Sequence, residues 1–421
     1  MSRCAGVTSR TLWRAQLSPR RPRPSRNPPR RFHARAPEPR MIHPGHPRSY
    51  VRFAAWAGII FFQGLSLAMA SSHLIYLGTY TRNGSKGIHA VRLDPDTGAL
   101  GTPFLTAETP DPAWITFSPD RKFLYAIHPS TAQAVGFAVD AESGRLTALQ
   151  AEAAATANPP SHLAVDATGR TLLAANYRDG FVAAIPIRAD GTLGPPNPIP
   201  HHGRGQYSKR QDKPHVHSVT PSPDNRFVIV ADLGVDRIFS YALDPSAATL
   251  TPANPPSVAT VPGAGPRHFK FGLDGKHAYA INELNSTIVA YDYDAPRGAL
   301  TPRQVISTLP ADFKAPSTTA EIRVHPNGKF VYGSNRGHDS IAVFAVDAAT
   351  GLLGAQPVEI VKSGGKTPRN FTLCPDGKWL VCAHQDQDIL TVFKVDPATG
   401  RLAKTPHTAP VPMCVCVLFY N

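Results

Sequence analysis

A turn motif that recurs at intervals of about fifty residues constrains the fold more than any other feature of this sequence. The motif begins with an acidic residue, in most copies continues through a glycine, and closes with a leucine. Aspartate or proline at the start and a glycine that can adopt a positive φ are typical of tight hairpin turns. Seven copies occur after residue 71, beginning at Asp94, Asp140, Asp190, Asp244, Asp294, Asp347 and Asp396.

A second turn motif, of the kind seen at residues 118–122 and 374–378, precedes each of the last six copies. Alternating apolar segments such as 330–333 follow these turns, and no helical periodicity appears after residue 71. Each repeat therefore predicts four short antiparallel strands. Seven such repeats predict an all-β fold, a seven-bladed β-propeller with four-stranded antiparallel blades.

The first repeat begins with the strand-like segment 74–77 and lacks the innermost strand of its blade. The segment 414–419 near the C-terminus has the pattern of that missing strand. We therefore expect the C-terminal strand to close the ring and to protect both edges of the first blade. Because no linker separates the repeats, residues 71–421 are predicted to form one propeller domain.

The formal net charge of +14 would suit a nucleic-acid-binding protein if it were spread over the whole chain. Instead, residues 1–70 contain 13 Arg and a single acid, Glu38, whereas the remaining residues are nearly balanced, with 31 basic and 29 acidic side chains. A nearly neutral propeller argues against a nucleic-acid partner. Five cysteines are too few for a disulfide scaffold.

The N-terminal region divides at Met41. Residues 1–40 are rich in Arg and Pro and are predicted to be a disordered leader, or to precede the true start of translation; a basic arm for nucleic acid or an anionic membrane is the alternative. Residues 41–70 have the pattern of a signal peptide, with Arg48 and Arg52, an apolar run and a small-x-small site ending at Ala70. The run is shorter than the roughly 20 residues of a spanning helix, so cleavage is favoured over an uncleaved anchor. We expect a periplasmic or secreted protein with no stable membrane association after cleavage.

The topology of a four-stranded blade sorts residues by face. The innermost strand begins where the second strand ends, whereas the Asp-led turns lie on the opposite face and are interpreted as scaffold. Histidine, arginine and glutamate gather at the predicted starts and ends on the first face, and a polar central pocket is the default ligand site of such a fold. The alternative is that these groups only pair with one another and hold the blades together.

The pair His215 and His217 raises the question of a metal site, but zinc requires three or four converging ligands. His162 and His268 could complete such a set only if the geometry happened to bring them together. We therefore expect no metal and no cofactor, and favour an acid–base role for one histidine. The long connection 194–214 carries several His, Arg and Lys residues. It would add positive charge beside the pocket, or else be a solvated loop.

Residues 72–420 resemble the seven-bladed lactonase family, which includes propeller-type 6-phosphogluconolactonases and fungal carboxy-cis,cis-muconate cyclases. The resemblance is carried by residues 76–81, 210–217, 265–268, 282–284 and 334–341. In the cyclase branch, the resemblance implies a His, two Arg and a Glu around the central pocket. His217, Glu283 and Arg267 match three of these and are assigned to catalysis. Arg336 is the best match for the second arginine, with Arg323 and Arg369 as rivals, and these three together with His215 are assigned to substrate binding.

The resemblance implies a lactonase that opens a small anionic lactone of the sugar-acid type. Glu283 or His217 would serve as general base, while Arg267 and Arg336 would bind an anionic group or stabilise the oxyanion. Contact between Arg267 and Glu283 would lower the pKa of that carboxyl and favour His217 for proton transfer. Export departs from a cytosolic role on 6-phosphogluconolactone itself. A muconate lactonising cyclase and a non-catalytic exported propeller that binds a ligand or a protein are the alternatives, and the oligomeric state stays open.

Overall fold

The computed structural model describes residues 72–128, 133–149, 158–207 and 209–420, and these described residues belong to one compact unit. The predicted leader and signal peptide fall outside these described residues. Within the described part of the chain, no helix is both long enough and apolar enough to cross a bilayer.

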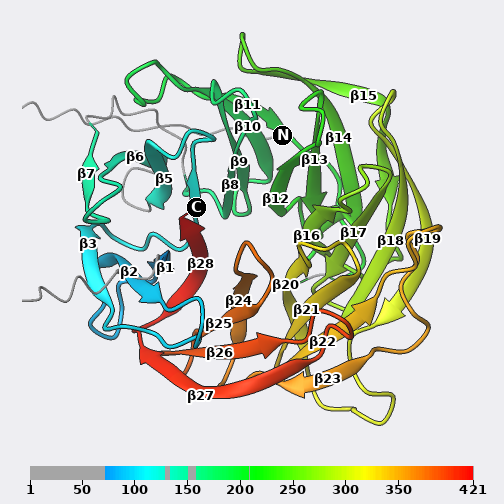
Figure 1. Cartoon of the computed structure of the whole chain (residues 1–421). Coiled ribbons are helices and arrows are strands. Elements are labelled where there is room, and N and C mark those ends of the chain that lie inside the picture. Colours follow the sequence, from blue (N-terminus) through cyan, green and yellow to red (C-terminus); the bar gives the residue numbers. More distant parts are fainter. Residues whose placement is uncertain (1–71, 129–132, 150–157, 208, 421) are drawn as a thin grey trace, which may run out of the picture. The chain divides into compact units, whose positions relative to one another are not determined.

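Seven antiparallel sheets of four strands each follow one another around a ring, which confirms the predicted seven-bladed propeller (Figure 1). Blades are numbered in chain order, and their strands are given from the centre of the ring outward. Blade 1 contains β28 (Cys414–Tyr420), β1 (His73–Thr79), β2 (Gly87–Leu93) and β3 (Phe104–Glu108). Blade 2 contains β4 (Ile115–Phe117), β5 (Phe123–His128), β6 (Gln133–Val139) and β7 (Leu146–Ala148). Blade 3 contains β8 (His162–Val165), β9 (Thr171–Asn176), β10 (Phe181–Pro186) and β11 (Asn197–Pro200).

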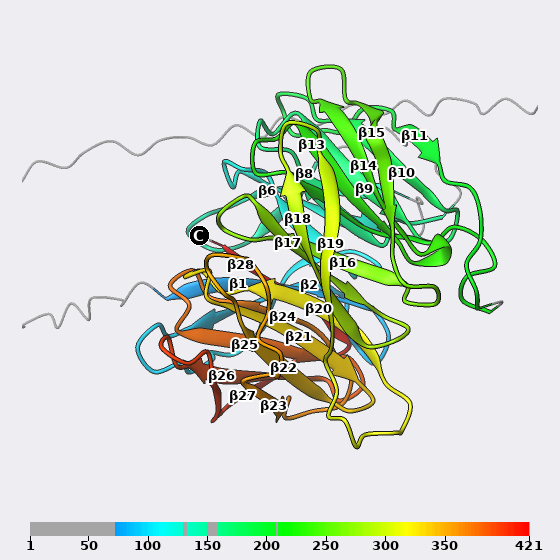
Figure 2. The ribbon, with the colours of Figure 1, turned by 90° about the vertical axis from the view of Figure 1, so that its right-hand side faces the viewer.

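The remaining blades repeat this arrangement, and Figure 2 shows the strands of blade 5 from the side. Blade 4 contains β12 (Val216–Pro221), β13 (Phe227–Asp232), the 3₁₀ turn η1 (Leu233–Val235), β14 (Arg237–Asp244) and β15 (Thr249–Ala259). Blade 5 contains β16 (Pro266–Phe271), β17 (His277–Asn282), β18 (Thr287–Asp294) and β19 (Ala299–Ser307). Blade 6 contains β20 (Thr318–Val324), β21 (Phe330–Arg336), β22 (Ser340–Ala345) and β23 (Glu359–Lys362). Blade 7 contains β24 (Pro368–Leu373), β25 (Trp379–His384), β26 (Ile389–Val395) and β27 (Leu402–Pro410).

The Asp-led motifs form the turns between the third and fourth strands, and they also join neighbouring blades. In the last copy, the Asp396 carboxylate accepts hydrogen bonds from the backbone N–H groups of Ala398 and Thr399. Gly400 has a φ of 73°, and a Cβ at this position would lie 2.5 Å from the Phe330 ring of blade 6. The Gly400 carbonyl also accepts a 2.9 Å hydrogen bond from the Tyr332 hydroxyl of blade 6. The glycine is thus required both by the turn and by the fit of one blade against the next.

The C-terminal strand closes the ring as predicted. β28 pairs with β1 in an antiparallel register that places Ile75 opposite Phe419 and Leu77 opposite Val417. These side chains join a buried apolar cluster shared with blade 7, in which Val381 and Val392 are fully buried. Closure therefore rests on the ladder of one inner strand and on apolar burial between the first and last blades.

Candidate active site

A cavity of about 500 Å³ lies on the face where the inner strands begin and the second strands end. Its lining carries six arginines and two carboxylates: Arg82, Arg178, Arg210, Arg267, Arg336, Arg369, Asp111 and Glu283. The excess of guanidinium groups gives the cavity a positive potential, which favours an anionic ligand. His217, His268, Trp114, Tyr80 and Tyr177 also line it.

Irregularities in strand pairing direct several of these side chains into the cavity. In β12, β16 and β24 the pairing with the second strand skips one residue, so His217, Arg267 and Arg369 each have no partner on the neighbouring strand. A β-bulge of this kind interrupts the alternation of side chains and re-aims the extra residue. The same position of three different blades thereby delivers a charged or titratable group to the cavity.

Glu283 is the most highly connected side chain of the cavity. It directly follows β17, is buried, and its backbone N–H donates to the Gly265 carbonyl over 2.8 Å. Three arginines reach its carboxylate: Oε2 lies 3.0 Å from Arg267 Nε and 3.2 Å from Arg336 Nη2, and Oε1 accepts a hydrogen bond from Arg210 Nη2. Burial alone would raise the pKa of Glu283, but the Arg336 and Arg267 guanidiniums outweigh it and hold that pKa well below its ordinary value. Glu283 is therefore a permanent carboxylate at neutral pH.

The guanidinium groups of Arg267 and Arg336 each contact the Glu283 carboxylate and, in addition, a backbone carbonyl of β20. Arg267 Nη1 donates to the Ala320 carbonyl at 2.7 Å and lies 2.9 Å from His268 Nε2. Arg336 Nη2 donates to the Thr319 carbonyl at 2.7 Å, while its buried Nε has no hydrogen-bond partner among the described residues. Buried donors of this kind are normally satisfied, so a bound molecule or water is the natural partner for Arg336 Nε.

His217 lies beside Glu283, with its Nε2 atom 3.8 Å from Glu283 Oε2. Burial, together with the nearby Arg267 charge, lowers the pKa of His217 well below its ordinary value, so the imidazole is neutral at neutral pH. Its Nδ1 atom has no hydrogen-bond partner in the described part of the chain. The rings of Tyr177 and His268 contact His217 edge-on, with centroid distances of 5.5 and 5.3 Å. His217 is thus a rigidly packed, neutral base next to a carboxylate.

Arg210 comes from the long loop between blades 3 and 4, for which the sequence left two interpretations open, added positive charge beside the pocket or a solvated loop. The neighbouring residue Gln211 anchors this loop, because its Nε2 donates to the Leu233 carbonyl at 2.8 Å and to Asp236 Oδ1 at 2.7 Å. The adjacent Tyr177 hydroxyl lies 3.4 Å from Arg210 Nη2. The loop therefore presents Arg210 to Glu283 in a defined position. Arg210 itself was not assigned from the sequence.

Of the side chains assigned from the sequence, His217, Glu283, Arg267, Arg336 and Arg369 line the cavity. His215 does not: its ring stacks on Tyr177, its Nδ1 contacts the Tyr177 carbonyl at 2.8 Å, and its Nε2 lies 3.2 Å from Asp212 Oδ1. Arg323 does not either, because it lies further along β20, where its Nε contacts the Phe371 carbonyl at 3.2 Å. Their side chains are engaged by the protein and are not presented to a ligand in this cavity.

A cluster of rings packs together beside these charges. Trp114 and His162 have ring centroids 4.0 Å apart, and His268 contacts both edge-on at 5.3 Å. Burial lowers the pKa values of His162 and His268 well below the ordinary value, so these rings are neutral. Within the described ranges, no group of three or more His, Cys, Asp or Glu side chains is arranged to hold a metal ion. We refer to Trp114, His162, His217 and His268 as the aromatic cluster.

The chain resembles known proteins over nearly all of the propeller. A sequence model of the lactonase seven-bladed β-propeller family matches residues 74–419. The 6-phosphogluconolactonase of Bacillus subtilis (strain 168) is 37% identical over 304 residues, which cover 72% of this chain and 85% of that protein. The 6-phosphogluconolactonase of Pectobacterium carotovorum is 32% identical over 253 residues, which cover 59% of this chain and 72% of that protein. The structure of a periplasmic gluconolactonase from Pseudomonas aeruginosa superposes with a TM-score of 0.77 and 33% identity, covering 83% of this chain and 99% of that one.

Proposed function

Since this chain belongs to the seven-bladed β-propeller lactonase family and is a lactonase of the 6-phosphogluconolactonase-like type, we propose that it hydrolyses an anionic sugar-acid lactone in the cavity around Glu283. The observation that carries this substrate class is the excess of arginines over carboxylates in the cavity lining. Guanidinium groups bind carboxylate or phosphate oxygens in a planar, bidentate fashion. Three of the six arginines, Arg82, Arg178 and Arg369, have no ion pair with a carboxylate among the described residues and are free to serve that purpose.

The chemistry follows from the protonation states of His217 and Glu283. A water molecule attacks the lactone carbonyl carbon and gives its proton to the neutral His217 ring, which acts as general base. Glu283, permanently ionised and 3.8 Å from His217, stabilises the imidazolium that forms. Arg267 and Arg336 stabilise the negative charge that develops on the carbonyl oxygen. When the ring carbon–oxygen bond breaks, His217 returns the proton to the leaving oxygen, and the open hydroxy acid is released.

We further propose that the propeller works in the periplasm or outside the cell, after cleavage near Ala70. The proposal is supported by the signal-peptide pattern of residues 41–70 and by the similarity to a gluconolactonase described as periplasmic. N-terminal sequencing of the protein from its native host should begin at or near Ser71. A mature cytosolic chain that retains residues 53–68 would contradict this location.

A panel of lactones tests the substrate class. The propeller should hydrolyse aldonolactones, and a lactone with a phosphate or carboxylate substituent should give a higher kcat/KM than its uncharged counterpart. The matched variant Arg369→Gln should reduce this preference more than it reduces turnover of the uncharged lactone. A folded protein that turns over no lactone would overturn the proposal. A muconate included in the panel would reveal cyclisation through loss of its ultraviolet absorbance.

A further inference from the structure

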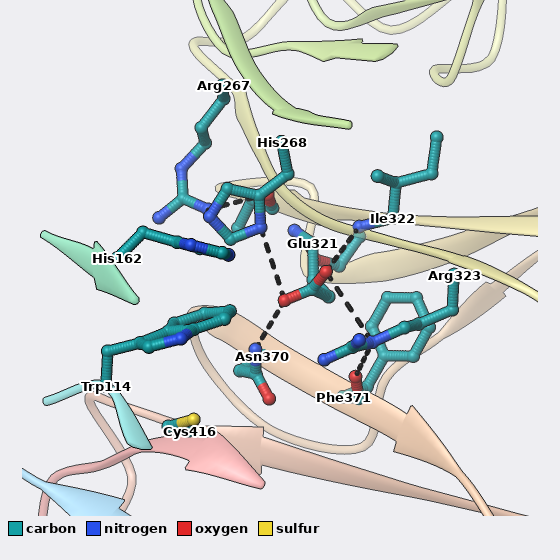
Figure 3. A network of polar contacts seen from close by, with 12 residues as sticks. Trp114, His162, Arg267, His268, Glu321, Ile322, Arg323, Asn370, Phe371 and Cys416 are labelled. Atoms are coloured by element: carbon teal, nitrogen blue, oxygen red, sulfur yellow. Dashed lines mark hydrogen bonds and ion pairs between the residues drawn. The ribbon is translucent and has the colours of Figure 1, made fainter. Parts of the chain in front are cut away.

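Behind the cavity, a second buried carboxylate, Glu321, completes a chain of polar contacts that leads to Arg267 (Figure 3). Glu321 is fully buried in β20, does not line the cavity, and takes no part in the chemistry outlined above. His268 lies between the two groups: its Nε2 is 2.9 Å from Arg267 Nη1, and its Nδ1 is 3.3 Å from Glu321 Oε2. We propose that Glu321 and His268 are positioning residues that hold the Arg267 guanidinium in its working orientation.

The two neighbours of His268 select the same protonation state. A guanidinium nitrogen can only donate, so His268 Nε2 must accept from Arg267 Nη1 and carries no hydrogen. The neutral ring then has its hydrogen on Nδ1, which is the atom that faces the Glu321 carboxylate. A carboxylate can only accept, so it favours the same tautomer. The Nδ1–H is not aligned for a good hydrogen bond, so Glu321 acts on the ring mainly through its negative charge.

Glu321 is in turn fixed by groups from its own strand and from blade 7. Its Oε1 accepts a 3.1 Å hydrogen bond from the Ile322 backbone N–H and lies 3.6 Å from Arg323 Nε. Its Oε2 accepts a hydrogen bond from Asn370 Nδ2. Each carboxylate oxygen therefore faces donors, which keeps the charge in place inside the protein. This gives Arg323 a function although it does not line the cavity: it helps to hold Glu321.

The network leaves Arg267 little freedom. Its Nε contacts Glu283, its Nη1 contacts His268 and the Ala320 carbonyl, and only Nη2 has no partner among the described residues. A guanidinium fixed on one side by an imidazole and on the other by a carboxylate presents its remaining N–H groups in one direction. Preorganised donors of this kind stabilise an oxyanion without reorganising during the reaction. The catalytic consequence rests on the lactonase function proposed above, whereas the tautomer and the orientation of Arg267 do not.

The substitution Glu321→Gln tests the proposal because it keeps the shape and removes the charge. The negative charge that favours the hydrogen on His268 Nδ1 is lost in either orientation of the new amide. Where the Ile322 N–H and Arg323 keep the amide oxygen at the Oε1 position, the amide NH₂ group also faces Asn370 Nδ2 and His268 Nδ1, and a donor there opposes the tautomer that Arg267 requires. The matched control is Asp166→Asn in the turn between β8 and β9, a carboxylate that is also fully buried and accepts only from its own turn and Asn225.

Two measurements read the outcome. In wild-type protein labelled with ¹⁵N-histidine, the ring nitrogen shifts of His268 should show a hydrogen on Nδ1 and a bare Nε2, and Glu321→Gln should change this pattern while Asp166→Asn should not. Lactone turnover should fall about tenfold to hundredfold in kcat for Glu321→Gln, with a smaller change in KM, because a slightly misplaced group costs rate more than binding. The control should retain the wild-type kcat.

The outcomes separate this proposal from the proposed function. A His268 ring with its hydrogen on Nε2 in the wild type, or a Glu321→Gln enzyme with the kcat of the control, would overturn the positioning role. If the wild type hydrolyses no lactone, the lactonase mechanism fails and the nitrogen shifts still decide the tautomer. Should Glu321→Gln not fold, His268→Gln and His268→Phe replace it. Glutamine can still accept from Arg267 and should retain more turnover than phenylalanine, and equal losses would contradict the proposal.

Discussion

The inner strands of blades 4, 5 and 7 differ from those of blades 2 and 3 by one residue each. In β12, β16 and β24 a bulge leaves His217, Arg267 and Arg369 without a partner, whereas β4 and β8 pair with their second strands without a shift. The bulged side supplies charge and a base to the cavity, and the regular side supplies Trp114, whose ring packs against His162. The comparison suggests that the repeat provides the scaffold and that one inserted residue in each of blades 4, 5 and 7 adds a charged or titratable group to those supplied by strand ends and loops.

The strongest test of this contrast removes the Glu283 carboxylate, which two of the bulge residues, His217 and Arg267, share. Glu283→Gln should lower kcat/KM by about tenfold to ten-thousandfold, because the imidazolium loses its counter-charge and three arginines lose their common anchor. The matched control Asp140→Asn changes an exposed carboxylate of the opposite face and should leave kcat/KM unchanged. Steady-state kinetics on both variants, with melting curves to confirm folding, makes the comparison. Equal kinetics would remove Glu283 from the site.

The three histidines of the aromatic cluster come from both regular and bulged inner strands, and together they predict how the stability of the fold depends on pH. Burial lowers the pKa values of His162, His217 and His268 in the folded state, so the unfolded chain binds protons first as pH falls below about 6.5. The free energy of unfolding should be at its full value above about pH 6.5. At lower pH it should decrease by up to about 1.4 kcal/mol per pH unit for each histidine. Denaturant unfolding between pH 7 and pH 5 measures the slope. In His162→Phe, one proton fewer is taken up on unfolding, so the slope of unfolding free energy against pH should be smaller by up to about 1.4 kcal/mol per pH unit. An unchanged slope would show that His162 does not contribute.

Arg267→Lys sharpens the comparison at a single bulge. Lysine retains the positive charge but loses the planar fork that contacts Glu283, His268 and the Ala320 carbonyl together. We expect kcat/KM to fall by about tenfold to hundredfold, less than for Glu283→Gln, because the electrostatic part of the interaction survives. Kinetics as a function of salt provides the check. Wild-type kcat/KM in the lysine variant would show that charge alone suffices.

The smallest effect is expected on the regular side. Trp114→Phe keeps an aromatic ring against His162 but removes the 3.0 Å hydrogen bond from the indole N–H to the Leu163 carbonyl. The free energy of unfolding should fall by about 1 kcal/mol, the usual value for one such bond. Lactone turnover should change by only a few-fold. A loss as large as that of Arg267→Lys would mean that the regular side also takes part in the chemistry.

The seven blades could be predicted from the sequence because their markers are local. An aspartate whose side chain accepts from the next backbone N–H groups, followed by a glycine with positive φ, specifies a hairpin turn without reference to the rest of the chain. Counting such turns gives the number of blades. The strand 414–419 was identified because the first repeat lacked a partner, and the pairing of β28 with β1 confirms that prediction.

The site was only partly predictable, because long-range contacts decide its details. Topology assigned Arg267 and Glu283 to one face, but strict alternation cannot place both Arg267 and His268 toward the centre, and the bulge that does so has no mark in the sequence. Arg323 was assigned to the cavity although its position beyond the irregular pairing of β20 takes it deeper. Arg210 depends on a loop anchored by Gln211 to residues of blade 4, a contact that no local pattern reveals.

The closing strand β28 also determines the order in which the blades are completed during folding. Blades 2 to 7 are each built from consecutive strands and can assemble as the chain emerges, but β1 must wait for β28, which follows every other described strand. Until that contact forms, β1 has an unpaired edge that another chain can use, and edges of this kind lead to aggregation. The entropy lost in joining two distant segments grows only with the logarithm of their separation in sequence, so the long separation of β1 and β28 lowers the stability of the folded ring only slightly. Its cost is kinetic, since the first blade is the last to become complete.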